Sequence, residues 1–427
     1  MTLKRFLPIL FLLSLSATTK SAGLSADVEQ RIAAVMPDVV TWRRDFHQNP
    51  ELSNQEFRTA AIVAEHMRSL GMEVHTDIAQ TGVVGILRGG EGPVVALRAD
   101  MDALPVTELV DLPFASKVRS TYRGQDVGVM HACGHDNHIA ILMGVAEVLA
   151  SMKDQLQGSV MFIFQPAEEG TPDGSVGGAE LMLEEGVFDL IKPDAVFGLH
   201  VFPFPAGVIA SRPGGLMASS DRLEITIKGT QTHGAIPWGG IDPIVTASQV
   251  VMGLQTIVSR QLDATLTPSI VTIGKIDGGV RNNIIPESVD LIGTIRTFDA
   301  ATRTDIHERI ERTATNIAAA AGATAEVNIS LGYGVTRNDP TLYRQMTPTL
   351  ESVAGNLFIE AQQTTGAEDF SYFANEVPGL FLFLGVGSDD PSMNFPNHSP
   401  RFFADERGLP VGVKALTALT LDYMATQ

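Results

Sequence analysis

The chain alternates short, uninterrupted apolar strands with amphipathic helices, and this alternation restricts the folds that it can adopt. Strand candidates are "GPVVALRAD" (92–100), "GSVMFIFQP" (158–166) and "DAVFGLHV" (194–201), and helix candidates lie at 28–46, 55–71 and 137–152. Strands that are apolar on both faces need cover on both sides of their sheet. Helices between the strands supply that cover when the strands run parallel. We therefore predict an α/β domain with a largely parallel sheet, its first helix capped by Asp27.

A second pattern interrupts the first near residue 214. Its elements run strand, helix, strand, strand, helix, strand at 221–228, 243–262, 269–276, 288–296, 302–321 and 323–331. This βαββαβ order is typical of a ferredoxin-like α+β unit, and Asp242 before Pro243 marks the start of its first helix. Because α/β patterning resumes with "GLFLFLGVG" (379–387), the unit is inserted into the larger domain. The larger domain therefore comprises 27–213 and 332–427, and 214–331 form an inserted domain suited to act as a lid or to dimerise.

The N-terminus has the pattern of a processing signal. Lys4 and Arg5 precede the apolar run "FLPILFLLSLSA" (6–17), and small residues follow it. The run is too short for a permanent membrane span and suits a secretory signal peptide. An interfacial or buried N-terminal helix is the alternative. We expect residues 1–22 to be a signal peptide and the mature protein to be periplasmic or secreted, without a stable membrane anchor.

The charge and the cysteine content narrow the function further. The formal net charge is −19, which argues against nucleic acid or an anionic membrane as the main partner, because both require a basic surface. Cys133 is the only cysteine, so an exported chain has no internal disulfide to form. Cys133 is therefore a buried inert thiol, a reactive nucleophile or a metal ligand.

Polar side chains follow several of the predicted strands at the point where each strand ends. Ligands of open α/β sheets bind at the carboxyl ends of the strands. The residues in such positions are Asp100, Asp102, Glu168, Glu169 and His200, with Cys133 and His135 before a helix and His398 after the strand at 379–387. Thiolate, imidazole and carboxylate suit Zn, Mn, Co or Ni, whereas Mg and Ca prefer oxygen alone. One of the adjacent glutamates can bind a metal while the other acts as a general base.

Each of these residues also has a simpler interpretation. A lone cysteine is commonly a small buried hydrophobic residue, and His200 beside an apolar strand could be a core histidine. The pair Glu168 and Glu169 could belong to a solvated loop. The presence of the whole set at one sheet edge favours a metal site.

A set of motifs in this chain resembles the M20 metallopeptidases. The motifs are "WRRDFHQNPELSNQE", "RADMDALPV", "HACGHD", "QPAEEG", "GLHV", "GTQTHGAIP", "NIIPESV", "GTIR", "GAEDFSYF" and "NHSPRF". They run in family order from about Trp42 to Arg401. The chain is most similar to the amidohydrolase branch, which includes hippurate hydrolases, N-acyl-amino-acid amidohydrolases and auxin–amino acid conjugate hydrolases.

The resemblance implies two divalent ions, Zn or Mn with Ni or Co as further candidates. It assigns as metal ligands Cys133, His135, Glu169, His200 and His398. It makes Glu168 the general base for a metal-bound water, and Asp102 a residue that orients a ligand. Most of the broader family has His-x-Asp where this chain has Asp100-Met101-Asp102, so Asp100 is a weaker ligand candidate. His131 and His138 match no ligand position and are interpreted as loop or helix-start residues.

The resemblance also assigns roles in the inserted domain. His233 corresponds to a histidine that stabilises the oxyanion, often from the partner subunit, and Asn283 and Arg296 match positions that bind the substrate carboxylate or the tetrahedral intermediate. Trp238 stands where many branch members have a second histidine. A homodimer or higher homo-oligomer that forms through the inserted domain is therefore expected.

The predicted function is hydrolysis of N-acyl or N-aroyl amino acids to a carboxylic acid and a free amino acid. A metallo-carboxypeptidase or dipeptidase that acts on small peptides is the neighbouring alternative. A non-catalytic exported binding protein and a hydrolase with Cys133 as nucleophile are alternatives from other classes.

Overall fold

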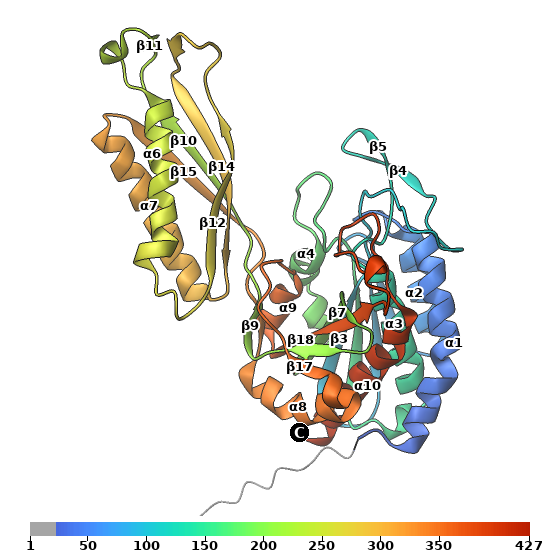
Figure 1. Cartoon of the computed structure of the whole chain (residues 1–427). Helices are drawn as coiled ribbons and strands as arrows, with labels where there is room; N and C mark the ends of the chain where they lie inside the picture. The colour runs from blue at the N-terminus through green and yellow to red at the C-terminus, as the bar shows by residue number, and fades with distance from the viewer. Residues whose placement is uncertain (1–22) are drawn as a thin grey trace, which may run out of the picture.

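The computed structural model describes residues 23–427. It shows two bodies that are joined by two connecting segments of the chain (Figure 1). The predicted signal peptide, residues 1–22, lies outside the described part. Within that part, no helix has both the length and the apolar character needed to cross a bilayer.

The larger body is built on an eight-stranded sheet with the order β1-β2-β6-β3-β7-β18-β8-β17. The strands are β1 (Glu73–Ile78), β2 (Gly82–Arg88), β3 (Val94–Asp100), β6 (Ser159–Gln165), β7 (Ala195–Pro205), β8 (Ile209–Ser211), β17 (Phe358–Glu360) and β18 (Gly379–Gly387). The central strands β6, β3, β7 and β18 are mutually parallel. Strands β1 and β2 extend the sheet beyond β6, and each of these two added pairs is antiparallel. The predicted α/β class with a largely parallel sheet is confirmed.

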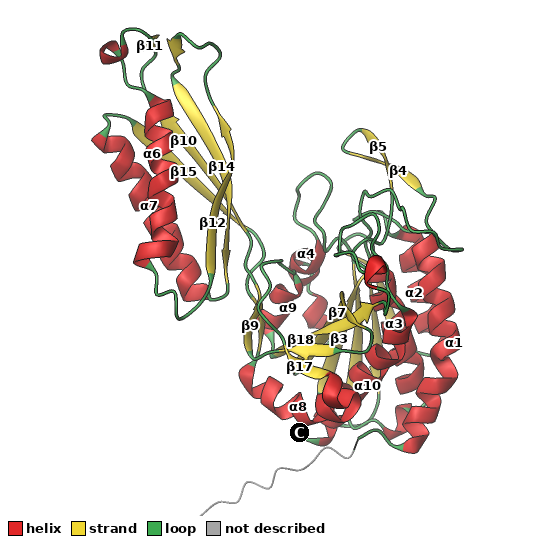
Figure 2. Cartoon of the chain, viewed as in Figure 1, coloured by secondary structure: helices red, strands yellow, loops and turns green. Residues whose placement is uncertain are grey.

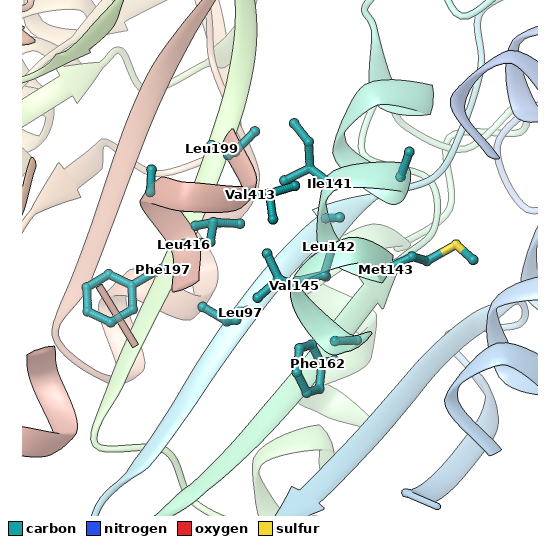
Figure 3. Packing of buried hydrophobic residues seen from close by; sticks show 14 of the residues in the cluster. Leu97, Ile141, Leu142, Met143, Val145, Phe162, Phe197, Leu199, Val413 and Leu416 are labelled. Atoms are coloured by element: carbon teal, nitrogen blue, oxygen red, sulfur yellow. The ribbon is translucent and has the colours of Figure 1, made fainter. Parts of the chain in front are cut away.

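Helices cover both faces of this sheet (Figure 2). They are α1 (Ala26–Gln48), α2 (Phe57–Ser69), α3 (His135–Ala150), α4 (Gly178–Glu184), α5 (Val187–Leu190), α8 (Pro340–Ala354), α9 (Phe370–Glu376) and α10 (Leu409–Ala425). Leu97 belongs to the core under α1, α2, α3 and α10, whereas its neighbour Ala96 belongs to the core under α4 and α9. Figure 3 shows Leu97 and Phe162 in the first of these cores, beside Val145 of α3. Successive strand residues point to opposite faces of the sheet. Leu97 and Ala96 must therefore both be apolar, because each faces one of the two cores.

The first helix begins earlier than the sequence indicated. Its N-cap is Ser25, whose Oγ accepts the amide hydrogen of Val28, and Asp27 lies inside the first turn. The N-cap assigned to Asp27 was therefore wrong. Asp27 instead pairs with Arg31 one turn further on.

The smaller body is the inserted unit, and its predicted βαββαβ order is confirmed. Its elements are β10 (Asp221–Lys228), α6 (Pro243–Thr256), β12 (Ser269–Asp277), β14 (Ser288–Thr297), α7 (Ala300–Ala320) and β15 (Thr324–Leu331). The four strands form an antiparallel sheet in the order β12-β14-β10-β15. Asp242 caps α6 as expected, with Oδ1 accepting the amide hydrogens of Ile244 and Val245.

Short strands mark both ends of the inserted unit. At its base, β9 (Gly214–Met217) pairs with β16 (Thr336–Asn338), so the two connections run side by side. At its far end, β11 (Thr232–His233) pairs with β13 (Ile284–Ile285) (Figure 1). A separate hairpin of β4 (Arg119–Tyr122) and β5 (Gln125–Gly128) belongs to the larger body.

A buried ion-pair cluster joins the inserted sheet to α7 near the connections. The carboxylate of Asp221 accepts hydrogen bonds from Arg303 and His307 and is fully buried. Burial disfavours this charge, but the hydrogen bonds from His307 and Arg303 outweigh it and lower the pKa of Asp221 to about 2. A carboxyl with a depressed pKa in the folded state stabilises the fold above its unfolded pKa, and that stability is lost as the pH falls through the folded value.

We expect Asp221→Asn to lower the free energy of unfolding at pH 7 by about 1–3 kcal/mol, because Arg303 loses its anionic partner. The difference between the two proteins should shrink as the pH falls from about 4 to about 2. Urea denaturation at several pH values measures both effects. Asp305→Asn on the same helix is the control, since its i,i+4 pair with Arg309 is partly exposed, unlike the buried Asp221 cluster, and should contribute less than about 0.5 kcal/mol. Equal losses in the two variants would contradict the prediction.

Candidate metal centre

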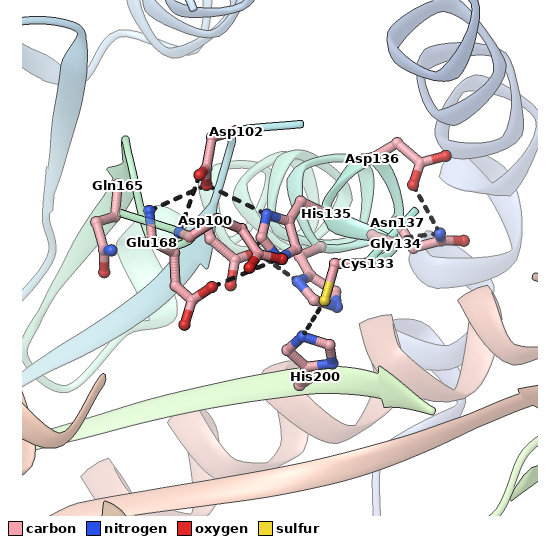
Figure 4. Close-up of polar contacts among 12 residues, drawn as sticks. Asp100, Asp102, Cys133, Gly134, His135, Asp136, Asn137, Gln165, Glu168 and His200 are labelled. Carbon is pink, nitrogen blue, oxygen red and sulfur yellow. Dashed lines mark hydrogen bonds and ion pairs between the residues drawn. The ribbon is translucent and has the colours of Figure 1, made fainter. Parts of the chain in front are cut away.

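The carboxyl ends of neighbouring parallel strands bring several of the predicted site residues together (Figure 4). Asp100 ends β3 and Asp102 follows two residues later, while Glu168 and Glu169 follow β6, the next strand in the sheet. His200 lies in β7 on the other side of β3. Cys133 and His398 lie in loops that reach the same edge, and His135 is the first residue of α3.

The five predicted metal ligands form two overlapping groups. Cys133, His135 and His200 offer ligand atoms that lie within 4.8 Å of one another, and so do Cys133, Glu169 and His398. Cys133 Sγ is 3.3 Å from Nε2 of His200 and 3.3 Å from Nε2 of His398. Nε2 of His398 is 3.0 Å from Oε1 of Glu169. Because the thiol belongs to both groups, the arrangement fits two ions that lie close to each other.

His135 is the buried centre of the cluster. Its Nδ1 lies 3.3 Å from Oδ1 of Asp102, and its Nε2 lies 4.0 Å from Oε2 of Glu168 without a hydrogen bond. Burial disfavours the imidazolium, but Asp100 and Asp102 outweigh it and raise the pKa of His135 to about 10. The surroundings of His135 therefore favour a positive charge at this position, and a divalent cation would supply it.

Asp102 holds the loop that carries the two adjacent glutamates. Its Oδ1 accepts the amide hydrogen of Glu168 at 3.1 Å, and its Oδ2 accepts that of Glu169 at 3.0 Å. The hydroxyl of Ser53 donates to the same Oδ2 at 2.8 Å. With His135 on its other side, Asp102 touches both the loop and an imidazole of the cluster. This placement agrees with the orienting role expected for it.

Glu168 points into the cluster from a buried position. Burial, then the charges of Glu368 and Glu169, raise the pKa of Glu168 well above its ordinary value. A raised pKa suits a group that must accept a proton and give it up again near neutral pH. The backbone carbonyl of Glu168 accepts a hydrogen bond of 2.6 Å from the hydroxyl of Tyr333, which belongs to the return connection from the inserted domain.

Cys133 has the surroundings of a ligand and not of a free nucleophile. Burial raises the pKa of its thiol well above the ordinary value, and the nearby carboxylates of Glu169 and Glu168 add to the effect. A nucleophilic cysteine needs a lowered pKa and a cationic neighbourhood. These surroundings favour the neutral thiol over the thiolate and so disfavour a nucleophilic role for Cys133.

As interpreted, His131 lies in the loop before α3 and His138 lies in the first turn of that helix. His138, however, has a partner on each ring nitrogen. Its Nδ1 pairs with Oδ1 of Asp100, and its Nε2 accepts the amide hydrogen of Val201, next to His200. His138 thus links the end of β3 to β7 beneath the cluster. His131 is buried, neither nitrogen has a hydrogen-bond partner among the described residues, and burial lowers its pKa to about 4.

A buried arginine that the sequence analysis did not select anchors this edge of the sheet. Arg98, on β3, contacts Asp100, Glu368 and Asp369 at 2.6–2.8 Å. Its Nε also donates to the side-chain oxygen of Gln165 at the end of β6. The available signal was a charged residue inside the apolar run "VVALRAD" together with the acidic pair in "GAEDFSYF".

A cavity of about 410 Å³ opens beside the cluster and reaches the connections to the inserted domain. It is lined by Cys133, Glu168, Glu169, His200, Phe202, Met217, Ser220, Arg296, Tyr333, Thr364, Gly366, Ala367, Glu368, Asn397 and His398. Arg296, a predicted substrate-binding residue, therefore reaches the site within one subunit.

The other two predicted residues of the inserted domain do not reach this cavity. His233 and Asn283 are exposed and neighbour each other on the β11–β13 pair, where the amide of Gly234 donates to the carbonyl of Asn283. Figure 1 shows that pair at the end of the inserted domain remote from the main sheet.

Comparisons with known proteins agree with this geometry. The family model Peptidase family M20/M25/M40 matches residues 96–422. "Thermostable carboxypeptidase 2" of Saccharolobus solfataricus is 39% identical over 405 residues, which cover 93% of this chain and 99% of the relative. "N-acetylcysteine deacetylase" of Bacillus subtilis is 38% identical over 392 residues, which cover 91% of this chain and 97% of the relative.

A solved structure supports the same relationship over the whole fold. The Bacillus subtilis YXEP protein, described as a dinuclear metal-binding peptidase of the M20 family, superposes with a TM-score of 0.78 at 35% identity. The match covers 92% of this chain and 100% of that one. The chain therefore belongs to peptidase family M20/M25/M40 and is a hydrolase of amide or peptide bonds.

Proposed function

We propose that this protein is a metal-dependent amidohydrolase that cleaves N-acyl or N-aroyl amino acids into a carboxylic acid and a free amino acid. The observation that carries the proposal is that one cavity is lined by Glu168, by Arg296 and by four of the five clustered ligand side chains, with the fifth, His135, buried behind them. The similar N-acetylcysteine deacetylase supports an N-acyl amino acid as substrate. The similar carboxypeptidase supports the second candidate, cleavage of small peptides.

The donor set fits two divalent ions held by Cys133, His135, Glu169, His200 and His398. A thiolate among the donors favours Zn or Mn, with Ni or Co as further candidates, over Mg or Ca. Such ions polarise the scissile carbonyl and lower the pKa of water. The description of the YXEP protein as dinuclear supports two ions and not one.

The chain's own residues supply proton transfer and orientation. Glu168 takes a proton from the attacking water and delivers it to the leaving amine nitrogen. The side chain of Arg296 is half-buried and makes no hydrogen bond or ion pair with another described residue, so its guanidinium is free to bind the substrate's carboxylate at two points. The carboxylate marks the amino-acid half of the substrate. Arg296 thereby sets the direction in which the substrate lies.

We also propose that the protein works as a homodimer or larger homo-oligomer in which His233 of the partner stabilises the oxyanion. Support comes from the inserted domain, where Val245 and Met252 of α6 are 54% and 70% exposed. Strand β12 lies at an open edge of the same sheet. Exposed apolar side chains and an unpaired strand edge commonly mark an interface.

We propose that the protein is exported to the periplasm or the medium. Support comes from the N-terminal sequence, in which Lys4 and Arg5 precede a short apolar run.

We expect Glu168→Gln to lower kcat by about 10²–10⁴-fold while the metal content stays unchanged, because the amide cannot accept the proton. The assay uses N-acetyl and N-benzoyl amino acids beside dipeptides, with metal analysis of each protein. Glu169→Gln is the matched neighbour and should reduce the metal content itself. A chelator should abolish the activity of the unaltered protein, and added Zn or Mn should restore it.

Full activity of Glu168→Gln would remove the base assignment. Hydrolysis of dipeptides without hydrolysis of any N-acyl amino acid would favour the peptidase candidate. Binding without turnover of every substrate in the panel would favour a binding protein.

Asp102→Ala should weaken metal binding by about 10–100-fold, because the carboxylate orients both His135 and the loop of Glu169. Asp102→Asn keeps the shape and one acceptor oxygen, so we expect a smaller loss. Competition with a chromogenic chelator measures both. Asp154→Asn, at an exposed site, is the control, and an affinity unchanged in all three variants would contradict the orienting role.

A mixture of Glu168→Gln and His233→Ala subunits should regain activity if His233 acts across the dimer. Each homodimer lacks one group at every site, whereas a mixed dimer has one site with both groups. Random mixing in a two-fold dimer then restores about a quarter of the sites. Activity measured after subunit exchange tests this. Absence of recovery, with subunit exchange verified by native mass spectrometry, would contradict action from the partner subunit.

A further inference from the structure

One wall of the cavity is built from segments that come together at the base of the inserted domain. Met217, at the end of β9, forms a bridge with Thr364. The amide of Ala218 donates to the carbonyls of Thr364 and Gly366 at 3.1 and 3.0 Å, and the amide of Thr364 donates to the carbonyl of Leu216 at 3.1 Å. These backbone hydrogen bonds fix the wall before any substrate arrives.

The same wall lies next to Arg296. The amide of Ser219 donates to the carbonyl of Thr297 at 2.8 Å, and the two side-chain hydroxyls are also 2.8 Å apart. Ser219 follows Met217 by two residues, and Thr297 directly follows Arg296. Met217 and Arg296 therefore approach the cavity from adjoining segments, whereas Cys133 and His398 line it from the metal cluster.

The position of this wall next to Arg296 determines which half of the substrate contacts it. In an N-acyl amino acid, the carboxylate and the side chain branch from the same carbon, on the nitrogen side of the amide. A substrate whose carboxylate pairs with Arg296 can therefore place its amino-acid side chain against Met217. The acyl group then lies on the opposite side of the scissile bond.

Building on the proposed function, we propose that Met217, Thr364 and Gly366 form the specificity pocket for the amino-acid side chain, and that the pocket selects apolar side chains. A Cβ atom at Gly366 would lie 3.5 Å from Cε of Met217 and 3.9 Å from Oγ1 of Thr364. That spacing is ordinary contact, so the glycine is not required by packing and instead leaves space open to the cavity.

The other side chains of the cavity agree with an apolar preference. Phe202 is held by Phe383, with ring centroids 4.4 Å apart, and presents a further aromatic surface. Glu168 and Glu368 are buried in the same lining, and their carboxyl groups disfavour an acidic side chain. An N-acyl derivative of methionine should therefore be a better substrate than one of glycine or glutamate.

The test is Gly366→Val, assayed on N-acetylmethionine, N-acetylglycine and N-benzoylglycine. The added side chain fills the space for the methionine side chain, so the ratio of kcat/KM for N-acetylmethionine to that for N-acetylglycine should fall by about tenfold or more. The ratio of N-benzoylglycine to N-acetylglycine, which reports on the acyl side, should change less than threefold. Gly366→Ala should shift the first ratio in the same direction by a smaller factor. It replaces the valine variant in the test if that variant does not fold.

Thr365→Val is the matched control, because it places the same side chain one position away, at an exposed residue outside the described lining. It should leave both ratios unchanged. The inference is overturned if Gly366→Val lowers all three substrates equally or changes the acyl ratio more than the amino-acid ratio. If the unaltered protein cleaves no N-acyl or N-aroyl amino acid, the proposed function itself fails, which is a distinct result.

Discussion

The carboxylate of Asp102 is the contact on which the geometry of the site depends. It accepts hydrogen bonds from two consecutive backbone amides, those of Glu168 and Glu169, and faces Nδ1 of His135. Three chain segments, the ends of β3 and β6 and the start of α3, are therefore held by one side chain. Fixing these two amides sets where both glutamate side chains lie, and with His135 they offer ligand atoms within 4.8 Å of one another.

The balance of charge beneath this contact explains why the site suits divalent cations. Arg98 faces Asp100, Glu368 and Asp369, so one buried cation neighbours three carboxyl groups. Buried carboxylates without compensation are costly, and in this cluster the cost appears as raised pKa values of Glu368 and Asp369. Added positive charge would favour their ionised forms and the thiolate of Cys133 together.

Patterns local in the sequence predicted the fold and the positions of the ligands at the strand ends. Apolar periodicity predicted strands such as β3 and β6, and the switch in pattern near residue 214 predicted the βαββαβ unit. Arg98 could not be assigned in this way, since its partner Glu368 lies 270 positions away and only the fold brings them together. The link from Tyr333 to the carbonyl of Glu168 was missed for the same reason. Ligand roles came from motif resemblance, which carries no information on how side chains such as His138 are packed.

One end of the inserted domain lies beside the cavity, whereas the other end lies remote from the main sheet. Arg296 and Met217 lie beside the paired connections β9 and β16, close to any axis about which the domain could turn. His233 and Asn283 lie at the opposite end, where the same rotation produces the largest displacement (Figure 1). Residues near a hinge move little when a domain closes. The proposed pocket beside Met217 and Arg296 is thus preformed in the single chain, whereas the β11–β13 end of the inserted domain lies away from the main sheet. If His233 acts on the oxyanion as proposed, recognition of the amino acid at the fixed wall can precede completion of the catalytic site.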